Sequence, residues 1–205
     1  MIDLYTSGTG NGFRAAIALA ESGLPHRVHA VDLAKGEQKT PEFLKRNPAG
    51  AIPVLVDSDG PGGTELALSQ SGAIVLYLAE KSGKFLPKDA TRRALALQWF
   101  MQAATDVAPS SGMIFMSGSA LPDKSAANTA FFENRLLGFL HVCDRQLAGQ
   151  DFLAGEISVA DLALYPVVAT RKALIDKAGD LSNLSRWAAA MAARPGVQRG
   201  MKLPD

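Results

Sequence analysis

The chain has 205 residues, 47% of them hydrophobic, which suits one large domain or two small ones with real hydrophobic cores. Its 21 basic and 20 acidic residues leave a net charge of +1, so no broad field draws it to nucleic acid or an anionic membrane. No apolar run approaches the roughly 20 residues that span a bilayer, no signal peptide is evident, and a single cysteine excludes an internal disulfide framework. We therefore expect a cytoplasmic protein.

The first 81 residues mix strand and helix signals. Strands are predicted over residues 2–5, 27–31, 54–56 and 65–68, and helices over 13–21, 41–46 and 71–81. Gly23 and Pro25 end the first helix, while Thr40 caps the second and Pro41 takes its first position. The segment before the first helix, residues 6–12, is a loop of Gly, Ser, Thr and Asn. These signals predict a βαβ unit followed by a hairpin and a third helix.

Strand signals nearly vanish after a linker at residues 83–88. Helices are predicted over residues 90–108, 126–147, 159–177 and 184–193, with breaks at 109–112, 121–123 and 149–155. Ser158 and Asp161 form a capping box, in which Ser158 caps a helix and Asp161 reaches back to it. We assign both a structural role. The predicted domains are residues 1–81, of mixed α/β type, and residues 88–205, all helical.

Two features of the first domain describe a ligand site. Pro53 follows a buried aliphatic residue and begins an apolar run, although proline cannot donate to a strand ladder. A cis Ile52-Pro53 peptide resolves this conflict and leaves backbone atoms of Ile52 or Val54 free to pair with an extended peptide. Ser71 opens a helix, whose N-terminus offers N–H groups and a positive dipole end to a carboxylate.

The chain resembles the glutathione transferase family over essentially its whole length. The resemblance is carried by residues in family order: Ile52-Pro53, Gln70-Ser71, Tyr77-Leu78-Ala79-Glu80-Lys81, Gly155, Ser158 and Asp161. It implies a thioredoxin-like N-terminal domain followed by an all-helical domain. It also implies a homodimer that uses glutathione as cosubstrate and needs no metal.

An enzyme that uses glutathione must stabilise a thiolate, because a thiol with a pKa near 8.5 is mostly protonated at neutral pH. In the family, the donor to the sulfur comes from the loop after the first strand. Here Thr9 and Asn11 resemble the pattern of the nu class, whose members tend to reduce glutathione disulfides. A Thr hydroxyl and an Asn amide can donate to a thiolate but cannot act as thiol nucleophiles. Ser7 is the alternative donor to the sulfur. A structural interpretation is also open, in which Thr9 only forms a turn and Asn11 only caps the helix.

The resemblance also assigns glutathione contacts to Gln38, Ile52, Pro53, Val54, Gln70 and Ser71. Gly50-Ala51 stands where a polar or basic side chain is common, which leaves recognition of the glycyl carboxylate unexplained. Gln70 replaces a frequent carboxylate, and a neutral amide compensates the γ-glutamyl ammonium less well. The second substrate is left open among a small hydrophobic electrophile, a peroxide and a disulfide, with reduction favoured over conjugation. A non-catalytic glutathione-binding or regulatory module is the alternative function.

Cys143 and His141 do not form a catalytic dyad in this interpretation. Two residues apart on a helix, they point about 200° from each other. The sequence holds no metal-ligand motif, so we predict no metal and no protein thiol in the chemistry.

Overall fold

The structure is a computed structural model that describes residues 1–202. Its contacts divide the chain into two compact units: Met1–Leu86 together with the described residues from Ala193 on, and Pro87–Ala192. Each unit has its own buried core. None of the helices within residues 1–202 combines the length and apolar character that crossing a bilayer requires.

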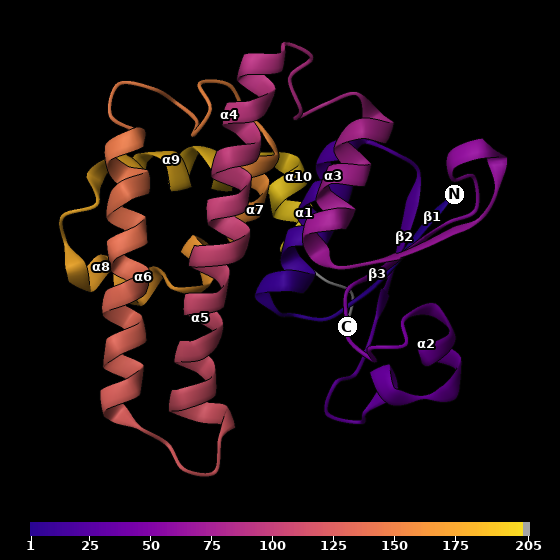
Figure 1. Cartoon of the computed structure of the whole chain (residues 1–205), viewed down its shortest axis with the longest axis horizontal. Coiled ribbons are helices and arrows are strands. Elements are labelled where there is room, and N and C mark those ends of the chain that lie inside the picture. The colour runs from indigo at the N-terminus through magenta and orange to yellow at the C-terminus, as the bar shows by residue number, and fades with distance from the viewer. Residues whose placement is uncertain (203–205) are drawn as a thin grey trace. The chain divides into compact units, whose positions relative to one another are not determined.

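The first unit is built on a four-stranded mixed sheet with the strand order β2-β1-β3-β4. Its strands are β1 (Ile2–Thr6), β2 (His26–Ala30), β3 (Val54–Asp57) and β4 (Leu66–Ser69). Strands β1 and β2 are parallel and joined by a helix, whereas β3 is antiparallel to both β1 and β4. The predicted βαβ unit and hairpin are therefore both confirmed, and the fold is thioredoxin-like (Figure 1).

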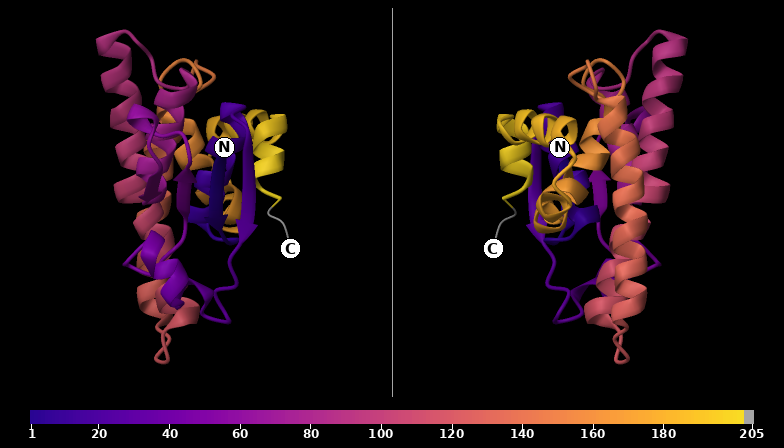
Figure 2. Two further views of the ribbon diagram at one scale, coloured as in Figure 1. Left: turned by 90° about the vertical axis from the view of Figure 1, so that its right-hand side faces the viewer. Right: turned by 90° about the vertical axis from the view of Figure 1, so that its left-hand side faces the viewer.

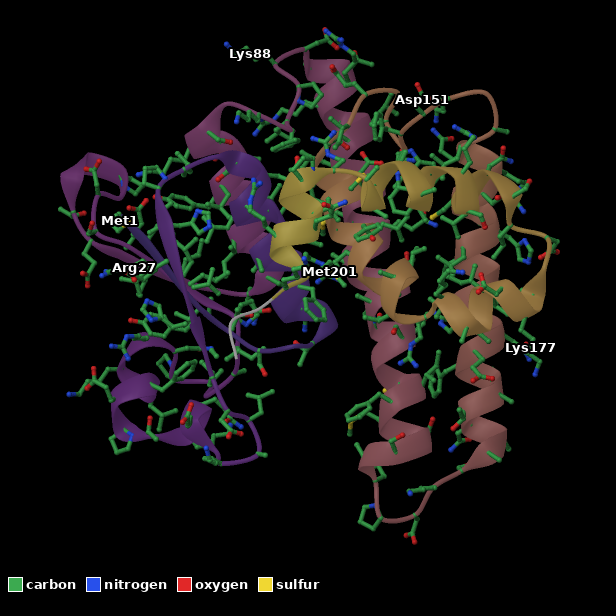
Figure 3. All side chains as sticks on the ribbon, turned by 180° about the vertical axis from the view of Figure 1, so that it is seen from behind. Met1, Arg27, Lys88, Asp151, Lys177 and Met201 are labelled. Carbon is green, nitrogen blue, oxygen red and sulfur yellow. The ribbon has the colours of Figure 1, made fainter. Side chains whose placement is uncertain are left out.

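Successive strand residues point to opposite faces of the sheet, so apolar side chains lie on both faces and helices pack over them. The longer helices are α1 (Gly10–Ser22) and α3 (Ser71–Ser82), which pack against each other, and the shorter is α2 (Pro41–Arg46). Phe43 of α2 packs with Tyr5 of β1 and Val54 of β3. On the edge strand β2, Arg27, labelled in Figure 3, forms an ion pair of 2.7 Å with Asp3.

The last helix of the described chain, α10 (Pro195–Gly200), packs against α1 of the first unit (Figure 2). The Glu21 side chain of α1 is 6% exposed and accepts from Arg194 at 2.5 Å and from the backbone N–H of Val197 at 3.1 Å. The sequence-based division placed residues 193–202 with the helical domain. The structure differs there, because this ion pair and the close packing hold α10 on α1.

The second unit is entirely helical among its described elements. Its helices are α4 (Ala90–Met101), α5 (Ala108–Phe115), α6 (Ala126–Gln146), α7 (Val159–Thr170), α8 (Lys172–Ala178) and α9 (Ser182–Ala192). Two π-helical segments, Gln102–Val107 and Met116–Ala120, extend α4 and α5. The chain then reverses, and α6 runs back beside α5 (Figure 1).

Two predictions about the helical unit are wrong. The break expected at residues 109–112 does not occur, because π-helical turns carry the chain from α4 into α5 and Pro109 falls near the start of α5, where a missing N–H is tolerated. The single helix expected over residues 159–177 is two, since Arg171 leaves helical geometry between α7 and α8.

The capping box at the start of α7 is confirmed. The Ser158 side chain accepts from the backbone of α7, and the Asp161 carboxylate accepts from the Ser158 backbone at 2.9 Å. Asp161 also accepts from the Leu153 backbone at 3.1 Å and from the Trp187 indole at 2.9 Å. All of these groups are buried. Their role is the structural one that the sequence predicted.

Candidate functional site

The register of the sheet brings the predicted site residues to one edge. Tyr5 near the end of β1 pairs with Val54 at the start of β3, and Val54 also pairs with Ser69 at the end of β4. The loop after β1, the Ile52-Pro53 turn before β3 and the entry to α3 therefore leave the sheet at the same edge. Segments about 60 residues apart in the sequence meet there.

Thr9 and Gly12 form the start of α1. The Thr9 hydroxyl caps the helix by accepting from the Gly12 N–H at 3.1 Å. A side chain at Gly12 has no room, because its Cβ would lie 2.0 Å from the Ser7 carbonyl oxygen. The loop at Ser7 and the first turn of α1 can therefore lie this close together only because residue 12 is a glycine. The N-cap of α1 is therefore Thr9 and not Asn11, which the sequence-based alternative made the cap, and the Thr9 hydroxyl hydrogen is not used by the cap.

Asn11 and Ser71 are joined by an arginine that the sequence analysis did not single out. Arg14 Nη1 donates to Asn11 Oδ1 and to Ser71 Oγ, both at 2.9 Å, and Ser71 Oγ donates to Asn11 Oδ1 at 3.3 Å. Arg14 and Ser71 are buried, whereas Asn11 is exposed. Burial lowers the pKa of Arg14 to about 10, so it remains a cation at neutral pH. A weak signal existed: Arg14 interrupts an otherwise apolar helix three residues after Asn11.

The entry to α3 carries a strained residue. Gln70 lies at the N-cap with φ 71° and ψ 112°, a region that side-chain-bearing residues rarely adopt, and its own side chain does not cap the helix. Ser71 follows as the first residue of α3, where the first backbone N–H groups have no partner within the helix. The predicted cis peptide at Ile52-Pro53 is confirmed.

Gln38 and Lys39 lie beside the loop that precedes the cis proline. Lys39 Nζ donates to the Ala49 carbonyl at 3.3 Å and would lie 2.9 Å from a Cβ at Gly50. Gln38 is half-buried, and its Oε1 is buried with no hydrogen-bond partner within residues 1–202. A buried acceptor without a donor is costly, so Gln38 suits a contact with a bound N–H group.

Other polar candidates are less well connected. Ser7 is half-buried, and its hydroxyl has no hydrogen-bond partner among the described residues. Cys143 is buried in α6, and burial with the nearby Asp161 charge raises the pKa of its thiol to about 12. His141 lies 3.7 Å from Asp180, so it has a different partner. Within residues 1–202, no group of three or more His, Cys, Asp or Glu side chains could hold a metal ion.

The cis-proline turn and two helix N-termini at one sheet edge, followed by a helical unit, define a thioredoxin-like protein with an appended all-α domain. A family model described as "Glutathione S-transferase, N-terminal domain" matches residues 11–81, and one described as "Glutathione S-transferase, C-terminal domain" matches residues 111–199. The chain belongs to the glutathione S-transferase family.

Curated relatives include two Escherichia coli proteins. The disulfide-bond oxidoreductase YfcG is 39% identical over 170 residues, which cover 82% of this chain and 79% of YfcG. The disulfide-bond oxidoreductase YghU is 32% identical over 216 residues, covering 97% of this chain and 73% of YghU.

Solved structures agree with the fold. A glutathione transferase from Pseudomonas putida, described with one glutathione disulfide bound per subunit, matches with a TM-score of 0.89 and 34% identity, covering 100% of this chain and 92% of that one. A glutathione transferase from Burkholderia graminis, described with two glutathione molecules bound per subunit, matches with a TM-score of 0.92 and 34% identity, covering 100% and 88%.

Proposed function

We propose that the chain is a glutathione-dependent enzyme that binds glutathione at this sheet edge. The peptide backbone of the ligand pairs with Ile52 or Val54 beside Pro53, as in strand addition. Its γ-glutamyl carboxylate lies at the N-terminus of α3, where Ser71 and free N–H groups converge. Gln70 and Gln38 complete the contacts. The buried Gln38 oxygen, which has no hydrogen-bond partner among residues 1–202, supports the part of Gln38 in them.

Asn11 and Thr9 stabilise the glutathione thiolate in this proposal. Both lie at the N-terminus of α1, whose dipole favours negative charge. Thr9 can donate because its oxygen, not its hydrogen, serves the helix cap. One hydrogen bond to a charged group is worth about 1.5–3 kcal/mol, enough to lower a thiol pKa by one to two units.

The reaction we propose is reduction of a disulfide by two glutathiones. One glutathione thiolate attacks a sulfur of the substrate disulfide, forms a mixed disulfide and releases one thiolate. A second glutathione thiolate attacks the glutathione sulfur of that mixed disulfide, forms glutathione disulfide and releases the other thiolate. Two electrons pass to the substrate, and the released thiolates take up the two protons that the glutathiones lost.

The observation that carries this proposal is a thiol-stabilising loop without a thiol. Thr9 and Asn11 stand at the mouth of α1, and the only cysteine of the sequence is buried elsewhere with a raised pKa. A protein mixed disulfide is therefore not available at this site. Two Escherichia coli relatives are named disulfide-bond oxidoreductases, and related structures are described with glutathione disulfide or two glutathiones, which supports reduction over conjugation.

Lys39 is our candidate for the glycyl carboxylate. The sequence lacks a basic residue at Gly50, but the Lys39 ammonium occupies the space beside that glycine. We expect Lys39→Met to weaken binding of glutathione. The glycyl ethyl ester of glutathione is the matched control, because without that carboxylate it should bind both proteins equally. An unchanged affinity for glutathione in Lys39→Met would remove Lys39 from the site.

Turnover of 2-hydroxyethyl disulfide, coupled to glutathione reductase and NADPH oxidation, tests the reaction. We expect glutathione-dependent reduction that exceeds conjugation of a chlorinated nitrobenzene. Faster conjugation, abolished by Ser7→Ala but not by Asn11→Ala, would make the chain a serine-type transferase. Binding of glutathione without either turnover would make it a non-catalytic module.

We also expect a homodimer, as the family resemblance implies, and a cytoplasmic location, as the sequence features described above indicate. Light scattering coupled to size-exclusion chromatography measures the oligomeric state, and a monomer at micromolar concentration would contradict the dimer. Cell fractionation tests the cytoplasmic location.

A further inference from the structure

A closed set of hydrogen bonds links the first turn of α1 to the first residue of α3. Arg14 donates through one nitrogen to both Asn11 and Ser71, and Ser71 donates to Asn11. The two ends of this set are the residues proposed above for the sulfur and for the γ-glutamyl carboxylate. Arg14 is 3% exposed, so its bond to Ser71 is shielded from water, whereas Asn11 at the other end is exposed.

The link determines which way the Asn11 amide faces. An arginine side chain has donors only, so the Asn11 atom facing Arg14 at 2.9 Å must be the oxygen. Ser71 donates to the same oxygen. The Nδ2 group, the only donor of this amide, is therefore left on the opposite side. A reversed amide would set its NH₂ against the guanidinium.

The Ser71 hydroxyl has one hydrogen, and Asn11 takes it. Its oxygen accepts from Arg14, which leaves one lone pair but no further donor. Ser71 can donate to a bound carboxylate only by giving up its bond to Asn11. Arg14 then remains as the donor that holds the Asn11 oxygen. Occupation of one half-site thus changes the hydrogen bonding of the other.

We propose that Arg14 is a positioning residue that couples the carboxylate half-site at Ser71 to the thiol half-site at Asn11. It keeps the Asn11 amide donor turned toward the ligand sulfur when the carboxylate claims the Ser71 hydroxyl. This inference rests on the proposed function, because it needs glutathione bound at these two residues. The buried guanidinium also adds a positive charge beside both anionic groups of the ligand.

The first test compares Arg14→Met and Arg14→Lys with the unaltered protein, each with bound glutathione. The ultraviolet absorbance of the thiolate, followed against pH, gives the pKa of the bound thiol. We expect Arg14→Met to raise that pKa by about one unit and to lower kcat at neutral pH about tenfold, with a smaller change in KM. Arg14→Lys, which keeps a charged donor, should recover part of the shift.

Arg171→Met is the matched control. Arg171 is a half-buried arginine of the second unit that donates to Ser111 at 2.9 Å and 2.6 Å, and burial lowers its pKa as well. Its loss removes a comparable guanidinium without touching Asn11 or Ser71. We expect the thiol pKa to stay unchanged in this variant. Equal pKa shifts in Arg14→Met and Arg171→Met would overturn the positioning role.

A double-mutant cycle on Asn11→Ala and Ser71→Ala tests the coupling without altering Arg14. We expect the double variant to bind glutathione at least about three times more tightly than independent losses from the two single variants would predict. Independent losses in this cycle would contradict the coupling. Absence of glutathione binding and of a thiolate signal in the unaltered protein would instead refute the proposed function itself, so the two failures are distinguishable.

Discussion

Asn11 has one side-chain donor group, the Nδ2 amide, and this group faces away from Arg14 and Ser71. Its oxygen is taken by Arg14 and Ser71, and the residue is exposed. Asn11→Ala should therefore raise the pKa of bound glutathione by about one unit and reduce turnover about tenfold. Thr9→Ala should act in the same direction more weakly, because the Asn11 amide and the helix dipole remain. Thiolate absorbance against pH, with Ser7→Ala as control, measures both effects.

Cys143 lies at the other extreme of reactivity. Its thiol is buried, and a pKa raised to about 12 keeps it protonated at neutral pH. We expect Cys143→Ala to keep glutathione-dependent turnover within about twofold of the unaltered enzyme, and to cost about 1 kcal/mol of stability through lost packing. Steady-state kinetics on the folded variant decides this. Loss of disulfide reduction with the fold intact would make Cys143 the nucleophile after all.

The sequence predicted individual site residues where a local rule applied. Ile52-Pro53 conflicts with its strand and Ser71 opens a helix, and both of these features are local. The cap of α1 differs, because the sequence pattern favours Asn11 and the structure has Thr9 there. The role of Arg14 could not be predicted, because a lone arginine in a helix is usually solvated and its buried partner Ser71 lies 57 positions away. The strained backbone of Gln70 was equally invisible, since glutamine has no preference for positive φ.

Among the elements, α10 and α1 pack closely, with Gly200 of α10 against the backbone of α1. A Cβ at Gly200 would lie 2.4 Å from the Cα of Ile17 and 2.5 Å from its nitrogen, both backbone atoms that cannot give way. Gly200→Ala should lower the free energy of unfolding by about 1–3 kcal/mol. Gly138→Ala in α6 is the control, because an added Cβ would meet no described atom within 4 Å beyond its chain neighbours and the backbone of its own helix, and it should raise the free energy of unfolding by about 0.5–1 kcal/mol. Urea unfolding of the two variants compares them, and equal stabilities would contradict the packing.

A buried carboxylate ties β3 to α3 and makes the first unit sensitive to acid. Burial raises the pKa of Asp57, but hydrogen bonds from Lys81 at 2.7 Å and Tyr77 at 2.6 Å bring it below its ordinary 3.8. A carboxyl whose pKa is lower in the folded state contributes stability above its unfolded pKa and loses it as pH falls through the folded value. We therefore expect the free energy of unfolding to fall below about pH 4. In Asp57→Asn that dependence should be shallower, and an identical pH dependence would contradict this assignment.

Helix boundaries were predictable where capping chemistry marks them. Thr40 and Pro41 start α2, and Ser158 starts α7, as the sequence indicates. The sequence could not show that Pro109 leaves its helix unbroken, because the π-helical turn before it, Gln102–Val107, leads directly into the start of α5. This turn also packs against α6 and α7, which are distant in the sequence.

At the scale of the whole molecule, all the residues proposed for the glutathione site lie in the first unit. A ligand that binds only the folded protein stabilises it by about 2.7 kcal/mol at 100 times its Kd. Glutathione and glutathione disulfide should both raise the midpoint of thermal unfolding. Ser71→Ala should reduce the shift, since it removes a group at the carboxylate half-site. An unchanged midpoint with either ligand at millimolar concentration would argue against binding.

The two-part organisation was visible in composition, because strand signals stop near residue 83. The return of α10 to the first unit was not. A six-residue helix has a weak pattern, and its partner Glu21 lies 173 positions before Arg194. Ion pairing over such a separation cannot be read from neighbouring residues.

That return has a consequence for how the protein is made. The helical unit is inserted between residues 86 and 193, so it is fully synthesised before the first unit receives its last helix. Although domains generally fold from the N-terminus during synthesis, the sheet here emerges from the ribosome early and waits more than half the length of the chain for α10. During that wait Glu21 lacks its arginine and the α1 surface is open to water. A nascent chain that stalls inside the helical unit therefore leaves uncovered the face of α1 on which α10 packs.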